Sequence, residues 1–272
     1  MFRWCAYCQH LIGEVPPLQD YRITHGICEA CAEHSGTYTP NPEILQAKAM
    51  FESLEEAGRT GDFAASSVAV DSAIEAGLKP SEVMVGVLHP ALVRIGQLWE
   101  SGEISVAEEH RFTDFALRLI DRLRFPQLLE SRPLVVLVTY PENSHEVGLR
   151  MLQILTWEQG IPCERLPAGT SAEVIAEVIT TQRPDLVGLS VSLVESIPAS
   201  LALADDLSRL LRPAANLVLG GQAFRRDDTP DLSPGLHVLK TVDNYVAYLQ
   251  ALHQRYDTRS DAIGPESSGR SS

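Results

Sequence analysis

The stretch Leu134-Val-Val-Leu-Val-Thr139, with Asn143-Ser-His-Glu-Val-Gly148 just after it, decides the fold of the second half of this chain. A short apolar run bounded by turn residues is typical of a buried strand, and Leu149 to Trp157 carry the apolar spacing of an amphipathic helix. Other apolar runs end at Ser190-Val-Ser192 and at Gly220-Gly221. Alternating strands and helices predict a parallel sheet, which binds its ligands at the carboxyl ends of the strands.

We therefore predict an α/β domain over residues 133–256, built as a Rossmann-like, flavodoxin-like sheet of five parallel strands. The predicted strands span residues 134–140, 161–166, 185–192, 216–220 and 236–240. The last helix is expected from Val242 to His253. Residues 257–272 are rich in Ser and Gly, and we expect them to form a disordered tail.

The segment before this domain, residues 43–131, has the apolar spacing of helices. Breaks at Gly58–Gly61, Gly77 and Gly102 divide it, and Pro80-Ser-Glu82 is typical of a helix start. The four expected helices run over residues 44–54, 63–74, 80–99 and 106–129. Because the breaks are short, we predict an antiparallel four-helix bundle that caps the α/β domain.

Four of the five cysteines occur as Cys5-x-x-Cys8 and Cys28-x-x-Cys31, which 19 residues separate. This spacing is typical of a four-thiolate zinc site, in which each pair directs two sulfurs to one tetrahedral ion. Because the segment has few apolar side chains, we predict a small zinc knuckle over residues 1–40 that depends on its metal to fold. Two disulfides and a redox pair are the competing interpretations.

Composition excludes several classes of function. The net charge of −14 and the absence of a Lys/Arg cluster argue against direct nucleic-acid binding. The apolar runs are far shorter than the roughly 20 residues of a membrane-spanning helix. The cysteine motif follows Met1 closely, without a signal peptide, so we expect a cytoplasmic protein.

The loops after the apolar runs carry residues suited to a corrinoid cofactor. His145 offers an imidazole for cobalt, and Gly148 lets the next helix start close to the corrin ring. Ser190 and Ser192 offer hydroxyls to the nucleotide tail, and Gly220-Gly221 lets the backbone approach without Cβ obstruction. An isolated His-x-x-Gly is usually only a polar loop. Its position between a strand and a helix favours a ligand site.

These loops resemble the base-off, His-on B12-binding domain of methionine synthase and its relatives. The pattern there is Asp-x-His-x-x-Gly, then Ser-x-Leu or similar, then Gly-Gly. Here Asn143 replaces the Asp, and the serine motif ends in Ser192. The resemblance implies that His145 is the lower ligand of cobalt and that the cobalamin tail lies along the serine and glycine loops.

A second motif lies in the predicted bundle, where nine residues separate Trp99 from Glu109-His110. Alone, it is typical of a core tryptophan and a surface charge pair. Together with the loops, it resembles the Trp-x9-Glu-His motif of CarH-type B12-dependent photoreceptors, in which a four-helix bundle covers the upper face of cobalt. The resemblance spans roughly residues 43–255. It implies that Trp99 packs over the 5′-deoxyadenosyl group and that Glu109 and His110 lie near it.

Two features depart from that family. The four-cysteine segment stands where the family has its DNA-binding domain. Glu100 follows the tryptophan, where the best-known members have a histidine that captures cobalt after illumination, and a carboxylate is a poorer ligand for Co(III). His89 and His110 are the other imidazoles of the bundle that we consider for that role.

The resemblance implies an adenosylcobalamin-dependent light sensor, not an enzyme, that signals through homo-oligomerisation or a separate regulatory protein. The alternative is a corrinoid methyl-carrier protein of a methyltransferase system. Such a carrier must expose its upper cobalt face, whereas an indole there would cover it. A third interpretation is a photocobilin-type sensor, which also binds a linear tetrapyrrole, or bilin.

Overall fold

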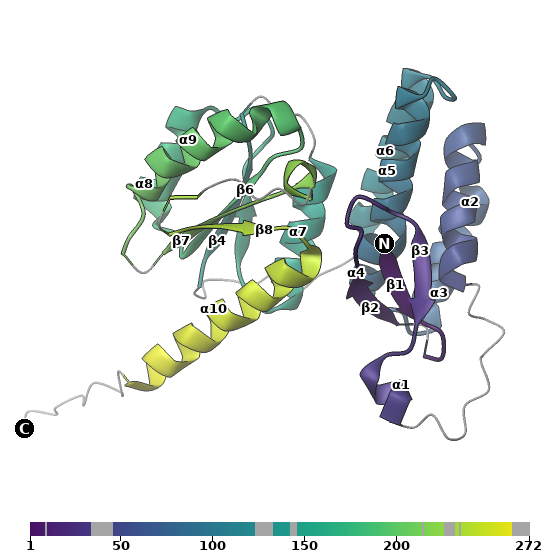
Figure 1. The fold of residues 1–272 in the computed structure, drawn as a ribbon, viewed down its shortest axis with the longest axis horizontal. Coiled ribbons are helices and arrows are strands. Elements are labelled where there is room, and N and C mark those ends of the chain that lie inside the picture. Colours follow the sequence, from purple (N-terminus) through teal and green to yellow (C-terminus); the bar gives the residue numbers. More distant parts are fainter. Residues whose placement is uncertain are drawn as a thin grey trace, which may run out of the picture.

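The computed structural model describes residues 1–8, 10–33, 46–122, 133–141, 146–213, 215–225, 232–233 and 235–262. A small N-terminal sheet, a set of helices and an α/β domain follow one another along the chain (Figure 1). None of the helices in these ranges is long and apolar enough to cross a membrane.

The α/β domain contains a five-stranded parallel sheet in the order β5-β4-β6-β7-β8. Its strands are β4 (Val135–Thr139), β5 (Cys163–Arg165), β6 (Leu186–Ser190), β7 (Asn216–Gly220) and β8 (Leu236–Leu239). The first strand along the chain lies beside the second and third, as in the flavodoxin-like order. The predicted fold class is therefore confirmed.

Helices cover both faces of this sheet. They are α7 (Val147–Glu158) and α10 (Val242–Ala262) on one face, and α8 (Ala172–Gln182) and α9 (Ile197–Ser208) on the other. Alternate residues of β4 supply the two cores: Val136 and Val138 face α8 and α9, whereas Val135 and Leu137 face α7 and α10. This burial on both faces explains why the strands are continuous apolar runs.

The C-terminal helix differs from the prediction. We expected it to end at His253 and a disordered tail to begin at residue 257, but α10 continues to Ala262. The hydroxyl of Tyr256 donates a hydrogen bond to the buried carboxylate of Asp185, which ties this part of the helix to the domain. Residues 263–272 of the predicted tail lie outside the described residues.

The bundle contains helices at each of the four predicted positions. They are α2 (Gln46–Thr60), α3 (Ala64–Glu75), α4 (Pro80–Val83) leading through the π-helical turn η2 (Met84–Leu88) into α5 (His89–Glu100), and α6 (Val106–Arg122). The third predicted helix is thus not uniform, because a π-turn interrupts it. The predicted continuation of α6 to residue 129 lies outside the described residues.

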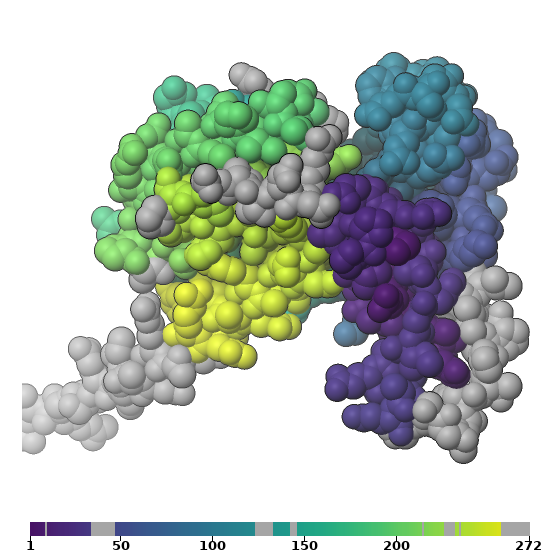
Figure 2. Space-filling model, in the orientation of Figure 1, coloured from purple at the N-terminus to yellow at the C-terminus, as the bar shows by residue number. Residues whose placement is uncertain are grey.

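Residues 1–8 and 10–33, here called the N-terminal module, form a three-stranded sheet in the order β2-β1-β3 followed by a short helix. The elements are β1 (Phe2–Cys5), β2 (Leu11–Glu14), β3 (Ile23–Gly26) and α1 (Glu29–Glu33). Strand β1 pairs antiparallel with β2 and parallel with β3. In the space-filling view the module, in purple, lies between the α/β domain and the bundle (Figure 2).

The module shares its apolar core with the bundle, which sequence reasoning missed. Phe2, Trp4 and Tyr21 are buried in one cluster with side chains of the bundle and of α7. The indole of Trp4 packs on Gly86 of the π-turn, where a Cβ would lie 2.4 Å from the ring, and Nε1 donates to the Gly86 carbonyl at 3.3 Å. The segment has too few apolar residues to form a core of its own. Docked on the bundle, it completes a core with the apolar side chains of the bundle.

Candidate functional site

The carboxyl ends of three neighbouring strands meet at one edge of the parallel sheet. Thr139 of β4 is in register with Ser190 of β6, and Ser190 is in register with Gly220 of β7. Backbone hydrogen bonds continue the pairing past the strand ends: Tyr140 N donates to Ser190 O at 2.9 Å, and Val191 N donates to Gly220 O at 2.8 Å. The serine and glycine motifs therefore form one continuous edge, which we call the strand-end site.

The glycine pair allows two loops to touch. Gly221 has φ +106°, and a Cβ there would lie 2.4 Å from the carbonyl oxygen of Val191, the residue between Ser190 and Ser192. A Cβ at Gly220 would lie 3.1 Å from the carbonyl oxygen of Leu239. A side chain at Gly221 is thus excluded both by its backbone angle and by the neighbouring loop.

Hydroxyl groups line the same edge. Ser190 and Ser192 are partly buried. Thr139, the last residue of β4, is 2% exposed, and its Oγ1 has no hydrogen-bond partner within the described part of the chain. A buried hydroxyl without a partner is unfavourable unless a ligand or water completes it. Sequence reasoning did not single out Thr139, although a polar residue that ends an apolar strand is a signal of such a role.

The loop that contains Asn143 and His145 lies outside the described residues, so their proposed roles stay predictions. The residues just after this loop are described. Glu146 accepts hydrogen bonds from Ala168 N at 2.9 Å and from Arg165 Nη1 at 3.1 Å. The Ala168 amide, more than the guanidinium, lowers the pKa of the Glu146 carboxyl. Gly148, the second residue of α7, has no other group within 4 Å of where its Cβ would lie.

The predicted bundle residues lie on either side of the short turn between α5 and α6. Trp99, near the end of α5, is 45% exposed, which is unusual for an indole. In the first turn of α6, Glu109 accepts a hydrogen bond from Thr113 Oγ1 at 2.9 Å, and its other oxygen lies 3.6 Å from Nε2 of the exposed His110. The structure thus brings the three residues of the motif to one end of the bundle.

A capping box sets the start of α6. Ser105 Oγ accepts from the backbone N–H of Glu108 at 3.3 Å, and the Glu108 carboxylate accepts from Ser105 N and Ser105 Oγ at 2.7 Å each. The Ser105 amide and hydroxyl lower the pKa of the Glu108 carboxyl. These reciprocal bonds fix the residue at which α6 begins, one turn before Glu109.

His89 has a different role from the one considered for it. Its ring packs edge-on against Phe2, at a centroid distance of 5.7 Å, and against Tyr21, at 5.6 Å, both in the N-terminal module. Burial, and then the nearby charge of Arg225, lower the pKa of His89 to about 4. His89 is therefore a neutral side chain at the module–bundle junction, whereas His110 is exposed.

The four predicted metal ligands converge. The Sγ atoms of Cys5, Cys8, Cys28 and Cys31 all lie within 4.8 Å of one another, and Cys8 Sγ is 3.7 Å from Cys28 Sγ. Sulfurs at about 2.3 Å from a tetrahedral zinc lie roughly 3.8 Å apart. All four are free thiols, so the cluster can hold a metal ion.

Within the cluster, backbone N–H groups favour the ionised form of the Cys5 thiol, whereas burial raises the pKa values of Cys8 and Cys31. Burial also opposes the ionisation of Cys5, but backbone N–H groups outweigh that effect and lower the pKa of Cys5 to about 6. Two of them donate directly to its Sγ, from Cys28 at 3.4 Å and from Tyr7 at 3.5 Å. The fifth cysteine, Cys163, is buried in the α/β domain, and burial raises its pKa to about 12.

Comparisons with known proteins find similarity to proteins that bind vitamin B12 in part of the chain. Residues 50–124 match the family model described as a B12 binding domain. The chain is 29% identical over 175 residues to the HTH-type transcriptional repressor CarH of Myxococcus xanthus, which covers 62% of this chain and 57% of that protein. The chain thus spans little more than half the length of this relative.

Among solved structures, the chain is similar in fold to the monomethylamine corrinoid protein of Methanosarcina barkeri. The TM-score is 0.59 at 15% sequence identity, over 75% of this chain and 99% of the other. At this identity the similarity concerns the fold alone.

Proposed function

We propose that this chain binds adenosylcobalamin between the strand-end site and the bundle and acts as a light sensor rather than as an enzyme component. The match of residues 50–124 to the B12 binding domain model and the similarity to CarH support cobalamin as the ligand. The observation that carries the sensor function is the half-exposed indole of Trp99 near the end of α5, at the end of the bundle where the Glu109–His110 pair opens α6.

The described residues of the strand-end site fit a cobalamin tail. The Thr139 hydroxyl is buried and has no hydrogen-bond partner among the residues that the structure describes, and the two-glycine loop keeps Cβ atoms away from the edge. Ser190 and Ser192 would donate hydrogen bonds to the amides and phosphate of the tail. His145 would bind cobalt from the loop after β4, and Asn143 would orient the imidazole through its other ring nitrogen. Bound adenosylcobalamin would supply a cobalt–carbon bond that visible light cleaves.

The bundle would protect the upper ligand. An indole left 45% exposed in the protein alone offers an apolar face for a bulky group. The Glu109–His110 pair in the first turn of α6 would offer hydrogen bonds to the hydroxyls of an adenosyl group. When that group leaves, Trp99 loses its partner, and the α5–α6 end of the bundle becomes free to repack. The signal would then pass to a second copy of this chain or to a separate regulatory protein.

The test is an absorption spectrum of protein reconstituted with adenosylcobalamin, recorded before and after green light, together with the oligomeric state in each condition. We expect a spectral change on illumination and a change in size. The variant Trp99→Ala should retain cobalamin but lose the adenosyl group faster. Val106→Ala, at an equally exposed apolar position near the same turn, is the matched control. No response to light in loaded protein would refute the sensor proposal.

The cobalt ligand is tested separately. The variant His145→Ala should leave cobalamin unbound or bound with its own lower base. His110→Ala, which changes an imidazole on the bundle side, should keep the lower ligation. Unchanged affinity and an unchanged spectrum in His145→Ala would contradict the assignment.

The similarity in fold to the monomethylamine corrinoid protein of Methanosarcina barkeri is the reason that the methyl carrier stays the alternative. A carrier should pass a methyl group from bound methylcobalamin to an added thiol with its methyltransferase partner and should be insensitive to Trp99→Ala. The photocobilin-type alternative is tested by adding a linear tetrapyrrole, since a bound bilin would add a long-wavelength absorption band.

We further propose that the ion in the four-cysteine cluster is zinc, because four thiolates at tetrahedral spacing suit it. Purified protein should contain about one zinc per chain by elemental analysis. The variant Cys8→Ser should lower that content, whereas Cys163→Ser should not, since Cys163 lies in the α/β domain. Equal zinc in both variants would contradict the assignment.

A further inference from the structure

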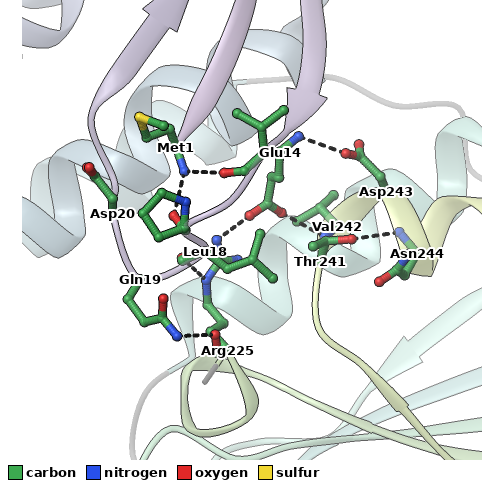
Figure 3. A network of polar contacts seen from close by, with 12 residues as sticks. Met1, Glu14, Leu18, Gln19, Asp20, Arg225, Thr241, Val242, Asp243 and Asn244 are labelled. Carbon is green, nitrogen blue, oxygen red and sulfur yellow. Dashed lines mark hydrogen bonds and ion pairs between the residues drawn. The ribbon is translucent and has the colours of Figure 1, made fainter. Parts of the chain in front are cut away.

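Arg225 joins the glycine loop of the α/β domain to the N-terminal module (Figure 3). It directly follows the 3-10 helix η4 (Gln222–Phe224), which begins after Gly220-Gly221. Its guanidinium pairs with the carboxylate of Glu14, and Nε donates to the carbonyl of Leu18 at 2.9 Å. In return, Gln19 Nε2 donates to the carbonyl of Arg225 at 2.9 Å. Both the side chain and the backbone of Arg225 are therefore held by the module.

A second contact joins the same strand of the module to the loop after β8. Glu14 Oε1 accepts from Val242 N, at the start of α10, at 2.8 Å, and Glu14 N donates to Asp243 Oδ2 at 2.8 Å. A Cβ at Gly13 would lie 2.5 Å from that oxygen, so the backbone of β2 lies too close to Asp243 for a side chain at this position. One carboxylate thus connects the ends of β7 and β8 to the module.

The pair depends on the position of the module. The side chains of Glu14 and Arg225 are 1% and 7% exposed, and Arg225 also lies over the ring of Tyr21, 4.9 Å from its centroid. Glu14, Leu18 and Tyr21, which hold the Arg225 side chain, all belong to the module. If the module moves, a buried guanidinium loses its compensating charge, and the loop that carries it has to rearrange.

The four cysteines determine whether the module keeps that position. Phe2 at the start of β1 is in register with Glu14 of β2, and β1 ends at Cys5. Cys28 and Cys31 lie after β3, the other neighbour of β1. An ion bound by the four sulfurs therefore links β1 to the segment after β3. Strand β1 pairs with β2, from which Glu14 projects.

We propose, on the basis of the proposed function, that the N-terminal module is a metal-dependent strap. It positions the Gly220–Arg225 loop of the strand-end site, so that the metal content of the cysteine cluster controls how long cobalamin stays bound. Glu14 and Arg225 are the positioning residues of this strap, and they act through the loop that they hold in place.

The first experiment uses cobalamin-free protein, so that it stands apart from the proposed function. Amide hydrogen exchange is followed by mass spectrometry with zinc bound and after chelation. After chelation we expect the amides of residues 216–225 to exchange about tenfold faster or more, because this loop should open locally more often. The amides of α6 should change little. Unchanged exchange over 216–225, or equal acceleration throughout the chain, would overturn the strap.

The second experiment measures cobalamin dissociation by absorption in the full chain. Arg225→Met should accelerate release by about tenfold or more, and chelation should add little to that variant, because the connection is already broken. In Arg225→Lys, which keeps the positive charge, zinc should again slow cobalamin release, but less than in the parent protein. Asp20→Asn, in an ion pair that stays within the module, is the matched control and should release cobalamin as the parent protein does.

The two experiments separate the two proposals. Protein that binds no cobalamin refutes the proposed function but leaves the exchange result as the test of the strap. Protein that binds cobalamin, and releases it at the same rate with or without zinc, overturns the strap and leaves the proposed function standing.

Discussion

The N-terminal module meets its two neighbours through interfaces of opposite chemistry. On the bundle, Phe2 and Trp4 are buried in a shared apolar core. On the α/β domain, contact depends on the Glu14–Arg225 pair and on hydrogen bonds around it. Apolar burial contributes stability with little dependence on direction, whereas a buried ion pair is favourable only at one geometry. The bundle interface therefore holds the module, and the polar interface selects its position.

The largest effect should come from the apolar interface. Trp4 is 1% exposed, and Trp4→Ala should lower the free energy of unfolding by about 3–5 kcal/mol because it leaves a large cavity. Denaturant unfolding followed by circular dichroism measures the loss. Ile12→Ala, at an exposed position of the same module, should change stability by less than about 0.5 kcal/mol. Equal losses in both variants would break the distinction between the interfaces.

The polar interface should give the next largest effect and a different pattern. Arg225→Met should lower the free energy of unfolding by about 3 kcal/mol, because it leaves the Glu14 carboxylate buried without its countercharge. The double variant Glu14→Leu/Arg225→Met should regain much of that loss, since no buried charge remains unpaired. A double-mutant cycle in denaturant measures the coupling. Simply additive losses would mean that the pair does not act as a unit.

Acid should weaken the interface between the module and the bundle, where the His89 ring packs on Phe2 and Tyr21. Burial holds the pKa of His89 at about 4, below its unfolded value of about 6.5, so the unfolded chain takes up a proton first as pH falls. Stability is complete above pH 6.5 and is lost toward pH 4, by at most about 2 kcal/mol at pH 5. Between pH 7 and pH 5, the midpoint temperature of thermal unfolding should decrease more steeply for the parent protein than for His89→Gln. Parallel pH profiles would exclude this contribution.

The smallest effect should come from a site outside both interfaces. Ser105→Ala removes half of the capping box of α6 and should cost about 1 kcal/mol. Hydrogen exchange in the first turn of α6 should rise while zinc content stays the same. A loss of zinc in this variant would mean that the bundle and the cysteine cluster are coupled more widely than their contacts indicate.

Patterns along the chain predicted the features that repeat. The apolar runs predicted the five strands, and their alternation with helices suggested the flavodoxin-like order that the sheet has. The breaks at glycine predicted the helices of the bundle. Motif spacing placed Ser190 and Gly220 at one edge, because parallel strands end at the same side of a sheet. Periodic burial is a local property, and a sequence displays it directly.

The remaining features depend on contacts between distant residues. Glu14 and Arg225 are 211 positions apart, and neither belongs to a motif. His89 was considered as a cobalt ligand because nothing in its local sequence indicates the aromatic rings of the module that enclose it. The role of His145 stays a prediction, since its loop lies outside the described residues.

The π-turn at Met84–Leu88 also sets a direction for the whole of α5. A π-turn contains one residue more than the α-helical turn it replaces, and each residue of an α-helix advances the side chains by about 100° around the axis. Every later side chain of α5, including Trp99, therefore points about 100° away from where an unbroken helix would direct it. Deletion of one residue from this turn would rotate the indole to another side of the helix while leaving its chemistry intact. The π-turn on which Trp4 packs thus determines the side of α5 from which Trp99 projects.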